Sequence, residues 1–262
     1  MTGPNDSRPP IAPGTDRAAS RRWRVEVVEE TASTNADVAE RFRAGEGEGL
    51  VLVAEHQTAG RGRLGREWVT PARTALTVSF LLMPGETPAE RWPWLPLLTG
   101  IAAAGAVRRV AGVEVDLKWP NDVLVDGHKL GGILLERVEH DGSAAAVVGV
   151  GINCTQTAEE LPVPEATSLA LVTGASVDRS ALLATLVEEL SERYDQWREG
   201  EDLRAAYLEL CRTPGEEVRV AVPGGEVVGQ AVDVDASGKL VVRTESREEH
   251  LGAGDVVYVR PR

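Results

Sequence analysis

The chain has 262 residues, enough for one large hydrophobic core and a small second domain, because single cores are usually outgrown near about 250 to 300 residues. Its formal net charge is −13 at pH 7, so its surface disfavours DNA and anionic membranes, which bind basic patches. The sequence has no long apolar run, no signal-peptide pattern and only two cysteines, Cys154 and Cys211. These features predict a cytoplasmic protein without a membrane span, a disulfide framework or a zinc cluster.

The N-terminal half alternates between predicted strands and helices. Residues 1–22 are rich in Pro, Gly, Ser, Asp and Arg without an apolar period, which predicts a disordered tail. A helix is expected after a Ser33 or Thr34 N-cap, with Gly45 just past its end. The other elements are three strands and one long helix, expected at 23–30, 49–55, 74–83 and 92–112.

The C-terminal half begins with a predicted hairpin. Strand 121–125 is followed by Asp126-Gly127, a dipeptide typical of two-residue hairpin turns, and by a return strand at 128–139. An apolar strand at 144–153 and helices near 179–199 and 201–210 follow. The last fifty residues contain short strands with turn signals every eight to twelve residues, which is typical of a small β-barrel. We therefore expect a tail at 1–22, a main domain at 23–213 and a second domain at 214–262.

The loop "GRGRLGR" at 60–66 concentrates positive charge between two apolar strands. Its three glycines leave backbone N–H groups accessible, and Arg61, Arg63 and Arg66 offer forked donors for a phosphate or a carboxylate. A solvated loop without a ligand is the alternative. The loop lacks the Gly-Lys-Ser/Thr of a P-loop, so the sequence indicates another kind of anion site.

The stretch "LKWPNDVLVDGHKLGGILLE" contains two of only three lysines in the chain, Lys118 and Lys129. Asn121 and Asp122 begin the hairpin, and a carboxylate at that place could hold Mg²⁺ together with substrate phosphates. Asp122 could instead cap the turn, and Lys129 could be an exposed hairpin lysine. Elsewhere, "GVGIN" at 149–153 would allow a flat ligand to approach closely, whereas "STN" at 33–35 is by itself an ordinary N-cap.

Together and in this order, "STN", "EHQTAGRGRLGREW", "KWPNDVLVDGHKLGGILLE", "GVGIN" and "ATSL" closely resemble the biotin protein ligases. The resemblance extends from about Trp23 to the C-terminus. It implies an α/β (α+β) mixed-sheet catalytic domain related to class II aminoacyl-tRNA synthetases, followed by an SH3-like β-barrel. The reading of residues 214–262 as short strands agrees with that second domain.

The resemblance also implies an activity and a set of site residues. Members activate biotin with MgATP to biotinyl-5′-AMP and transfer the biotinyl group to a lysine of the biotin carboxyl carrier domain of an acyl-CoA or pyruvate carboxylase. The implied biotin-binding residues are Ser33, Thr34, Asn35, Gln57, Arg61, Gly62, Arg63, Trp68, Lys129 and Gly131. The implied ATP or adenylate contacts are Arg61, Arg63, Arg66, Lys118, Asn121, Lys129 and Asn153. The implied catalytic cations are Lys129, Arg63 and Lys118, and Asp122 would hold Mg²⁺.

Relatives that double as repressors carry an N-terminal winged helix-turn-helix, whereas only about 22 residues precede the first predicted strand here, so DNA binding is not expected. Two alternatives stay open. A lipoate or octanoate ligase shares the acyl-activation chemistry, although the two long motifs resemble the biotin branch. A biotin sensor would bind without turnover, but mere binding requires neither Lys129 nor Asp122.

Overall fold

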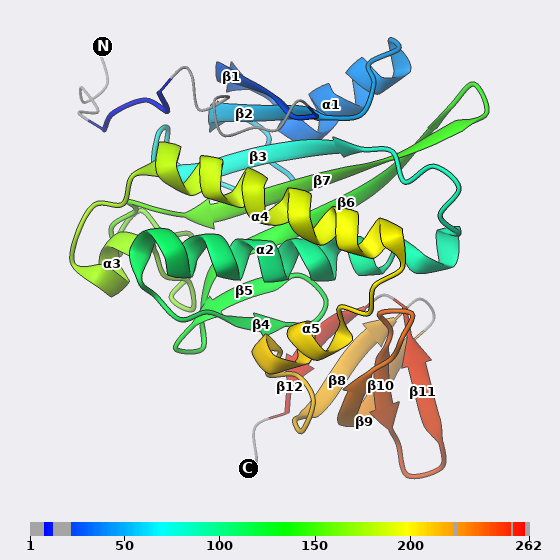
Figure 1. Ribbon diagram of the computed structural model, residues 1–262. Helices are drawn as coiled ribbons and strands as arrows, with labels where there is room; N and C mark the ends of the chain where they lie inside the picture. Colours follow the sequence, from blue (N-terminus) through cyan, green and yellow to red (C-terminus); the bar gives the residue numbers. More distant parts are fainter. Residues whose placement is uncertain (1–7, 13–21, 223–224, 253, 260–262) are drawn as a thin grey trace.

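The computed structural model describes residues 8–12, 22–222, 225–252 and 254–259, which form two β-sheets with helices packed on the larger one (Figure 1). The larger sheet has the strand order β1-β2-β3-β7-β6-β5-β4. It is mixed, because β1 and β2 are parallel and the other neighbours are antiparallel. Its strands are β1 (Arg24–Thr31), β2 (Leu50–Gln57), β3 (Ala75–Leu82), β4 (Asp116–Lys118), β5 (Asp122–Val125), β6 (His128–His140) and β7 (Ser143–Asn153).

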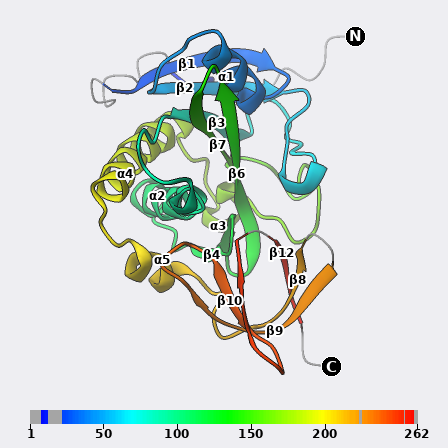
Figure 2. The same ribbon diagram turned by 90° about the vertical axis from the view of Figure 1, so that its right-hand side faces the viewer.

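Helices cover both faces of this sheet. Helix α1 (Thr34–Arg43) packs Val38 and Phe42 on one face, against Leu50 and Leu52 of β2. On the other face lie α2 (Trp94–Ala111) and α4 (Arg179–Glu199), which run side by side (Figure 2). All eight residues of β3 are buried as a result, and six of them are apolar. The shorter helices are α3 (Leu169–Thr173) and α5 (Arg204–Leu210).

The second sheet follows α5 and is entirely antiparallel, with the order β11-β10-β9-β8-β12. Its strands are β8 (Glu217–Val222), β9 (Gly225–Val234), β10 (Leu240–Arg243), β11 (Glu248–Leu251) and β12 (Asp255–Tyr258). Strand β11 was not predicted because its sequence, EEHL, has one apolar residue and no alternation to detect. The prediction of a mixed α/β domain followed by a small all-β unit is confirmed at this level.

Two tryptophans of the first domain connect the sheets. The indole N–H of Trp94 donates to the carbonyl of Ala236 at 2.7 Å, and that of Trp119 donates to the carbonyl of Gly238 at 3.0 Å. Gly238 has a φ of 80°, and a Cβ there would lie 3.2 Å from Leu97. A tight glycine turn of the second sheet therefore fits against α2, which fixes the position of the second sheet over β4 and β5.

The predicted hairpin turn is confirmed. Asp126 and Gly127 have φ angles of 50° and 78°, as the predicted hairpin turn requires. Cys154 and Cys211 are buried and free. No helix within the described ranges is long and apolar enough to cross a bilayer.

The expected disorder of the tail is wrong for residues 8–12. The Ile11 side chain is buried in the main core, and its backbone N–H donates to Glu55 Oε1 at 2.5 Å. The guanidinium of Arg179 donates to the Pro9 carbonyl at 2.8 Å and pairs with Glu55 at 2.7 Å. The composition of this segment is typical of disorder. The partners that hold it lie in distant parts of the chain, where no local pattern reveals them. The rest of the predicted tail, apart from Arg22, lies outside the described residues.

The Glu55–Arg179 ion pair provides a stability prediction. Both side chains are almost completely buried, so Arg179→Met leaves the Glu55 carboxylate buried and unpaired. We expect a loss of about 3 to 5 kcal/mol in the free energy of unfolding, measured by urea denaturation. Arg109→Met is the control, because Arg109 pairs with Glu188 and Glu189 at the surface and should cost at most about 1 kcal/mol. Equal losses in the two variants would contradict the role of the buried pair.

Candidate active site

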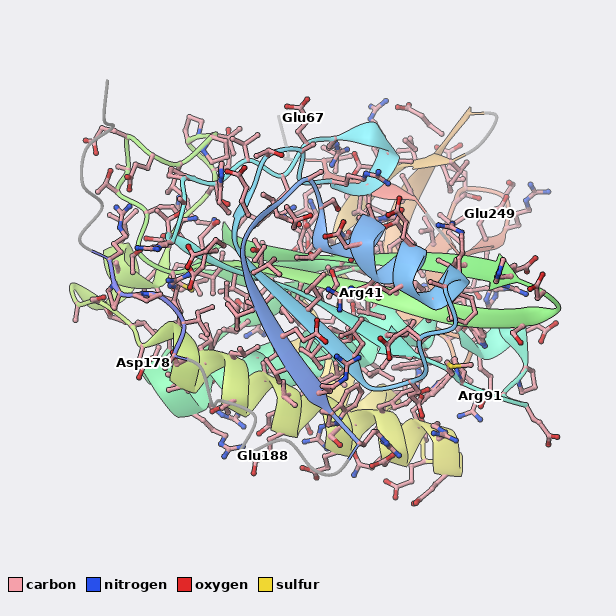
Figure 3. All side chains as sticks on the ribbon, turned by 90° about the horizontal axis from the view of Figure 1, so that it is seen from above. Arg41, Glu67, Arg91, Asp178, Glu188 and Glu249 are labelled. Carbon is pink, nitrogen blue, oxygen red and sulfur yellow. The ribbon has the colours of Figure 1, made fainter. Side chains whose placement is uncertain are left out.

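A solvent-open cavity of about 780 Å³ lies where the ends of several elements of the large sheet meet the second sheet. Its wall is formed by the start of α1, the end of β2, the Gly/Arg loop, the β4–β5 turn, the glycine-rich parts of β6 and β7, and β12. In the view from above, Glu67, which directly follows the Gly/Arg loop, lies on the opposite side of the molecule from Glu188 of α4 (Figure 3). The predicted site residues that line the cavity are Ser33, Thr34, Asn35, Gln57, Arg61, Gly62, Arg63, Arg66, Trp68, Asn121, Asp122 and Lys129.

One part of the cavity wall is a network of polar side chains, in which Asn35 Nδ2 donates to the Glu136 carboxylate at 2.7 Å. The Ser79 hydroxyl bridges Thr34 Oγ1 at 2.7 Å and Asn35 Oδ1 at 2.6 Å. Gln57 Oε1 accepts from the backbone N–H of Thr34 at 2.8 Å and from its hydroxyl at 3.0 Å. Ser33 is the N-cap of α1, yet its side chain accepts no capping hydrogen bond and lines the cavity. The "STN" segment therefore does more than start a helix.

Glycines let two polar or aromatic side chains lie directly on the β7 backbone. A Cβ on Gly149 would stand 2.4 Å from Asn35 Oδ1, and one on Gly151 would stand 2.6 Å from the Trp68 ring. The buried indole N–H of Trp68 has no hydrogen-bond partner within the described part of the chain. Gly131 does not line the cavity: a Cβ there would meet the Gly151 carbonyl at 2.4 Å, so its absence allows β6 and β7 to pack closely.

The arginines of the loop have three different partners. Arg63 donates to Asn121 Oδ1 at 3.0 Å, and burial lowers the pKa of its guanidinium. Arg66 forms an ion pair with Asp255 of β12. Arg61 lies 3.8 Å from Glu136 of β6. The loop is thereby attached to the β4–β5 turn, to the second sheet and to β6, with its cations facing one cavity.

Lys129 is anchored more firmly than an exposed hairpin lysine would be. Its ammonium lies 2.6 Å from Asp122 Oδ1. Its backbone N–H donates to the Glu165 carbonyl at 2.8 Å, and its carbonyl accepts from the Thr167 N–H at 2.9 Å. The ion pair fixes the ammonium and the two backbone hydrogen bonds fix the main chain, so the charge of Lys129 is held at the cavity wall.

Lys118 does not line the large cavity, but it borders a small neighbouring one together with Asn121 and Asp122. Burial lowers the pKa of its ammonium group, while Asp122 and Asp255 act through space in the opposite direction. Its Nζ lies 4.9 Å from the ring centre of Tyr258. Lys118 is therefore a cation behind the cavity wall, beside the Asp122 carboxylate.

Asn153 is also outside the cavity wall. It is buried, its Nδ2 donates to the Thr167 carbonyl at 2.9 Å, and its Oδ1 accepts from Gln156 at 3.0 Å. The Nδ2 end of the amide thus ties the end of β7 to Thr167, whose backbone N–H holds the Lys129 carbonyl. A direct contact between Asn153 and a nucleotide stays a prediction.

Asp255 is a charged cavity residue that the sequence did not reveal. It is one of 41 acidic residues and lies 189 positions from its partner Arg66 along the chain, so no local pattern distinguishes it. Across the described residues, no group of three or more His, Cys, Asp or Glu side chains is arranged to hold a metal ion. A metal at Asp122 would thus depend on ligands from a substrate.

Comparison with known proteins agrees with this geometry. Residues 26–153 match the biotin/lipoate A/B protein ligase family, and residues 213–258 match the biotin protein ligase C-terminal domain. A biotin–[acetyl-CoA-carboxylase] ligase of Mycobacterium tuberculosis is 42% identical, with 99% of this chain and 100% of that protein covered. A bifunctional ligase/repressor of Escherichia coli is 33% identical over 75% of this chain and 62% of its own length.

A solved structure leads to the same family. The biotin protein ligase from Aquifex aeolicus in complex with biotin and ATP has a TM-score of 0.76 and 30% identity, covering 90% of this chain and 99% of that one. The chain belongs to the biotin protein ligase family.

The Arg66–Asp255 ion pair should restrain the loop. Asp255→Asn removes a largely exposed pair, which is worth at most about 1 kcal/mol, so the loop should open about two- to fivefold more often. The measurement is the initial rate of trypsin cleavage after Arg61, Arg63 or Arg66 under native conditions. Glu226→Gln, which removes an exposed ion pair with Arg219 elsewhere in the second sheet, is the control. An unchanged cleavage rate in Asp255→Asn would contradict the restraint.

Proposed function

We propose that this protein activates biotin with ATP to biotinyl-5′-AMP, releasing pyrophosphate, and transfers the biotinyl group to one lysine of a biotin carboxyl carrier domain. The observation that carries the proposal is a single cavity whose wall combines two kinds of polar group. One part of the wall has the hydroxyl and amide groups of Thr34, Asn35 and Gln57, and another has Arg61, Arg63, Arg66 and Lys129. Such a cavity suits an elongated ligand with a neutral polar head and an anionic tail.

The part of the wall around Thr34 suits the ureido ring of biotin. A ureido group has a carbonyl acceptor and two N–H donors, and the Thr34 hydroxyl, the Asn35 and Gln57 amides and the Glu136 carboxylate beside Asn35 supply donors and acceptors. The glycine-lined backbone of β7 and the Trp68 ring provide flat apolar surface for the bicyclic ring system.

The cationic part of the wall suits the chemistry of adenylation. The biotin carboxylate oxygen must form a bond to the α-phosphorus while the bond to pyrophosphate breaks, so two anions have to approach each other. Fixed cations offset this repulsion and stabilise the charge of the transition state. The carrier lysine amine then attacks the acyl carbon and AMP leaves. A closed loop over the adenylate would exclude water that otherwise hydrolyses it.

Asp122 fits the part of a magnesium anchor. Mg²⁺ is commonly held by one or two carboxylates together with substrate phosphates, and Asp122 lies in the cavity wall beside Lys129. When bound with ATP, the metal ion would supply positive charge to the polyphosphate. In the protein alone, the Asp122 carboxylate instead compensates the charge of Lys129.

The finer structural assignments belong to the same proposal. We infer that the main domain at 23–213 is related to class II aminoacyl-tRNA synthetases and that residues 214–262 form an SH3-like barrel. The antiparallel order of five short strands supports the second assignment. We further propose a cytoplasmic enzyme with a carrier domain of acyl-CoA or pyruvate carboxylase as its protein substrate, and no DNA partner.

The geometry favours biotin over lipoate. The dithiolane ring of lipoate has no N–H or C=O groups, so it would leave buried hydroxyl and amide groups at Thr34, Asn35 and Gln57 without ligand partners. A site built to hydrogen-bond its substrate rejects an analogue that lacks those groups. The paired Lys129 and Asp122 likewise favour a ligase over a sensor, because binding alone does not require a cation beside a metal anchor.

The purified protein should therefore catalyse exchange of labelled pyrophosphate into ATP only when biotin and Mg²⁺ are present. This assay measures adenylate formation in the forward and reverse directions without the carrier protein. Lipoate at the same concentration should give no exchange. Exchange with lipoate and none with biotin would contradict the assignment, and tight biotin binding without exchange would favour the sensor.

Lys129→Arg should cost nearly as much activity as Lys129→Ala. The compact ammonium is held at 2.6 Å from Asp122 by a backbone fixed on both sides, and a wider guanidinium cannot occupy that position without displacing a partner. Loss of one preorganised donor typically lowers the rate by ~10² to 10³. The measurement is single-turnover adenylate formation at saturating biotin and MgATP. A Lys129→Arg rate above about half of the wild-type value would show that any cation suffices.

A further inference from the structure

Strand β12 of the second sheet supplies two side chains to the catalytic region, and only Asp255 lines the large cavity. The second is Tyr258, whose ring centre lies 4.9 Å from Lys118 Nζ. Lys118 lies on the other domain, at the end of β4. The contact therefore joins a candidate catalytic cation to a residue 140 positions later in the chain.

The charged groups around Lys118 make its contact with Tyr258 important for the position of the ammonium. Asp122 and Asp255 act on the ammonium only through space, and none of the carboxylates in the described residues forms an ion pair with it. Lys129 and Arg66 add like charge nearby. The Tyr258 ring lies in direct contact with the ammonium and adds to the attraction of the two carboxylates, because the face of an aromatic ring attracts cations.

Thr213, between the two domains, links the residue that follows Lys118 to Tyr258. The Thr213 hydroxyl accepts from the backbone N–H of Trp119 at 2.9 Å, directly after Lys118. The same hydroxyl lies 3.3 Å from the Tyr258 phenol oxygen. Burial raises the pKa of Tyr258 to about 12, so the phenol stays neutral at physiological pH. The ring therefore has a fixed position and adds no negative charge.

An aromatic partner leaves a cation available in a way that a carboxylate does not. A carboxylate at hydrogen-bond distance offsets the charge of an ammonium and occupies one of its N–H donors, as Asp122 does for Lys129. A ring face orients the ammonium from one side and leaves donors for an incoming anion.

We propose that Tyr258 is a positioning residue of the second domain, which holds the Lys118 ammonium unneutralised toward the anionic groups of the adenylation reaction. Through this contact the second domain contributes to catalysis by orienting a residue of the first. The kinetic part of this inference rests on the proposed function, whereas the contact itself does not.

The contact can be tested by NMR without any activity. The chain has only three lysines, Lys118, Lys129 and Lys239, so protein labelled with [¹³Cε]-lysine gives three Cε–Hε signals, which single Lys→Arg variants assign. The Lys118 Hε protons should be shifted upfield by the ring current of Tyr258. The shift should persist in Tyr258→Phe and disappear in Tyr258→Leu. Absence of an upfield shift in the wild-type protein would overturn the proposal, even if the leucine variant does not fold.

The kinetic consequence is tested by a double-mutant cycle. A cation–π contact of about 0.5 to 2 kcal/mol corresponds to about 2- to 30-fold in rate, so Tyr258→Leu should lower single-turnover adenylation at saturating substrates by that factor. Tyr258→Phe should stay within about twofold of wild type. In a Lys118→Met background, Tyr258→Leu should have no further effect, because the two residues act together.

Controls separate positioning from simple destabilisation. Val257 is exposed on the same strand, so Val257→Ala should change neither the NMR signal nor the adenylation rate. Independent, multiplying effects of Tyr258→Leu and Lys118→Met would overturn the proposal. If wild-type protein formed no adenylate from biotin and ATP, the proposed function would fail, while the NMR result would still decide whether Tyr258 holds Lys118.

Discussion

Mutual repulsion among cations is the constraint on which the rest of the site depends. An acidic chain concentrates Arg61, Arg63, Arg66, Lys118 and Lys129 around one region, and these charges oppose one another until an anionic substrate arrives. Their partners are of three kinds: carboxylates for Arg61, Arg66 and Lys129, an amide for Arg63 and an aromatic ring for Lys118. The partners come from β5, β6, β12 and the β4–β5 turn. The architecture of two sheets is therefore also the means by which the charges are kept in place.

The partners differ in how much of each cation's charge, and how many of its N–H donors, they leave available for an anionic substrate. The carboxylate of Asp122 forms an ion pair with Lys129, whereas Asn121 and Tyr258 are neutral partners that orient Arg63 and Lys118. Burial makes the last two charges more costly, since it lowers the pKa of both groups. A site that combines compensated and uncompensated cations can attract an anion without being unstable in its absence.

Local patterns in the sequence were sufficient to predict most helices and strands and the site residues that lie on the two long motifs. Alternation and apolar runs located the strands of the main sheet, and Asp126-Gly127 located the hairpin turn. What escaped prediction depends on contacts across the chain. Asp255 and Tyr258 reach the site from the second sheet, and Ile11 docks against Glu55 in spite of a composition typical of disorder. Gly131 and Asn153 were recognisable as motif residues, but their role in packing became visible only with their neighbours β7 and Gln156 in place.

The docking of residues 8–12 also has a consequence for biosynthesis. Ribosomes synthesise a chain from its N-terminus, so this segment is made before the residues that it contacts. Its partners are Glu55, Glu160, Arg179 and Ser180, and the last two belong to the start of α4. Residues 8–12 therefore cannot complete their contacts, and the buried Glu55 carboxylate lacks its guanidinium, until α4 has been synthesised. Completion of the core around Glu55 is thus coupled to release of most of the chain.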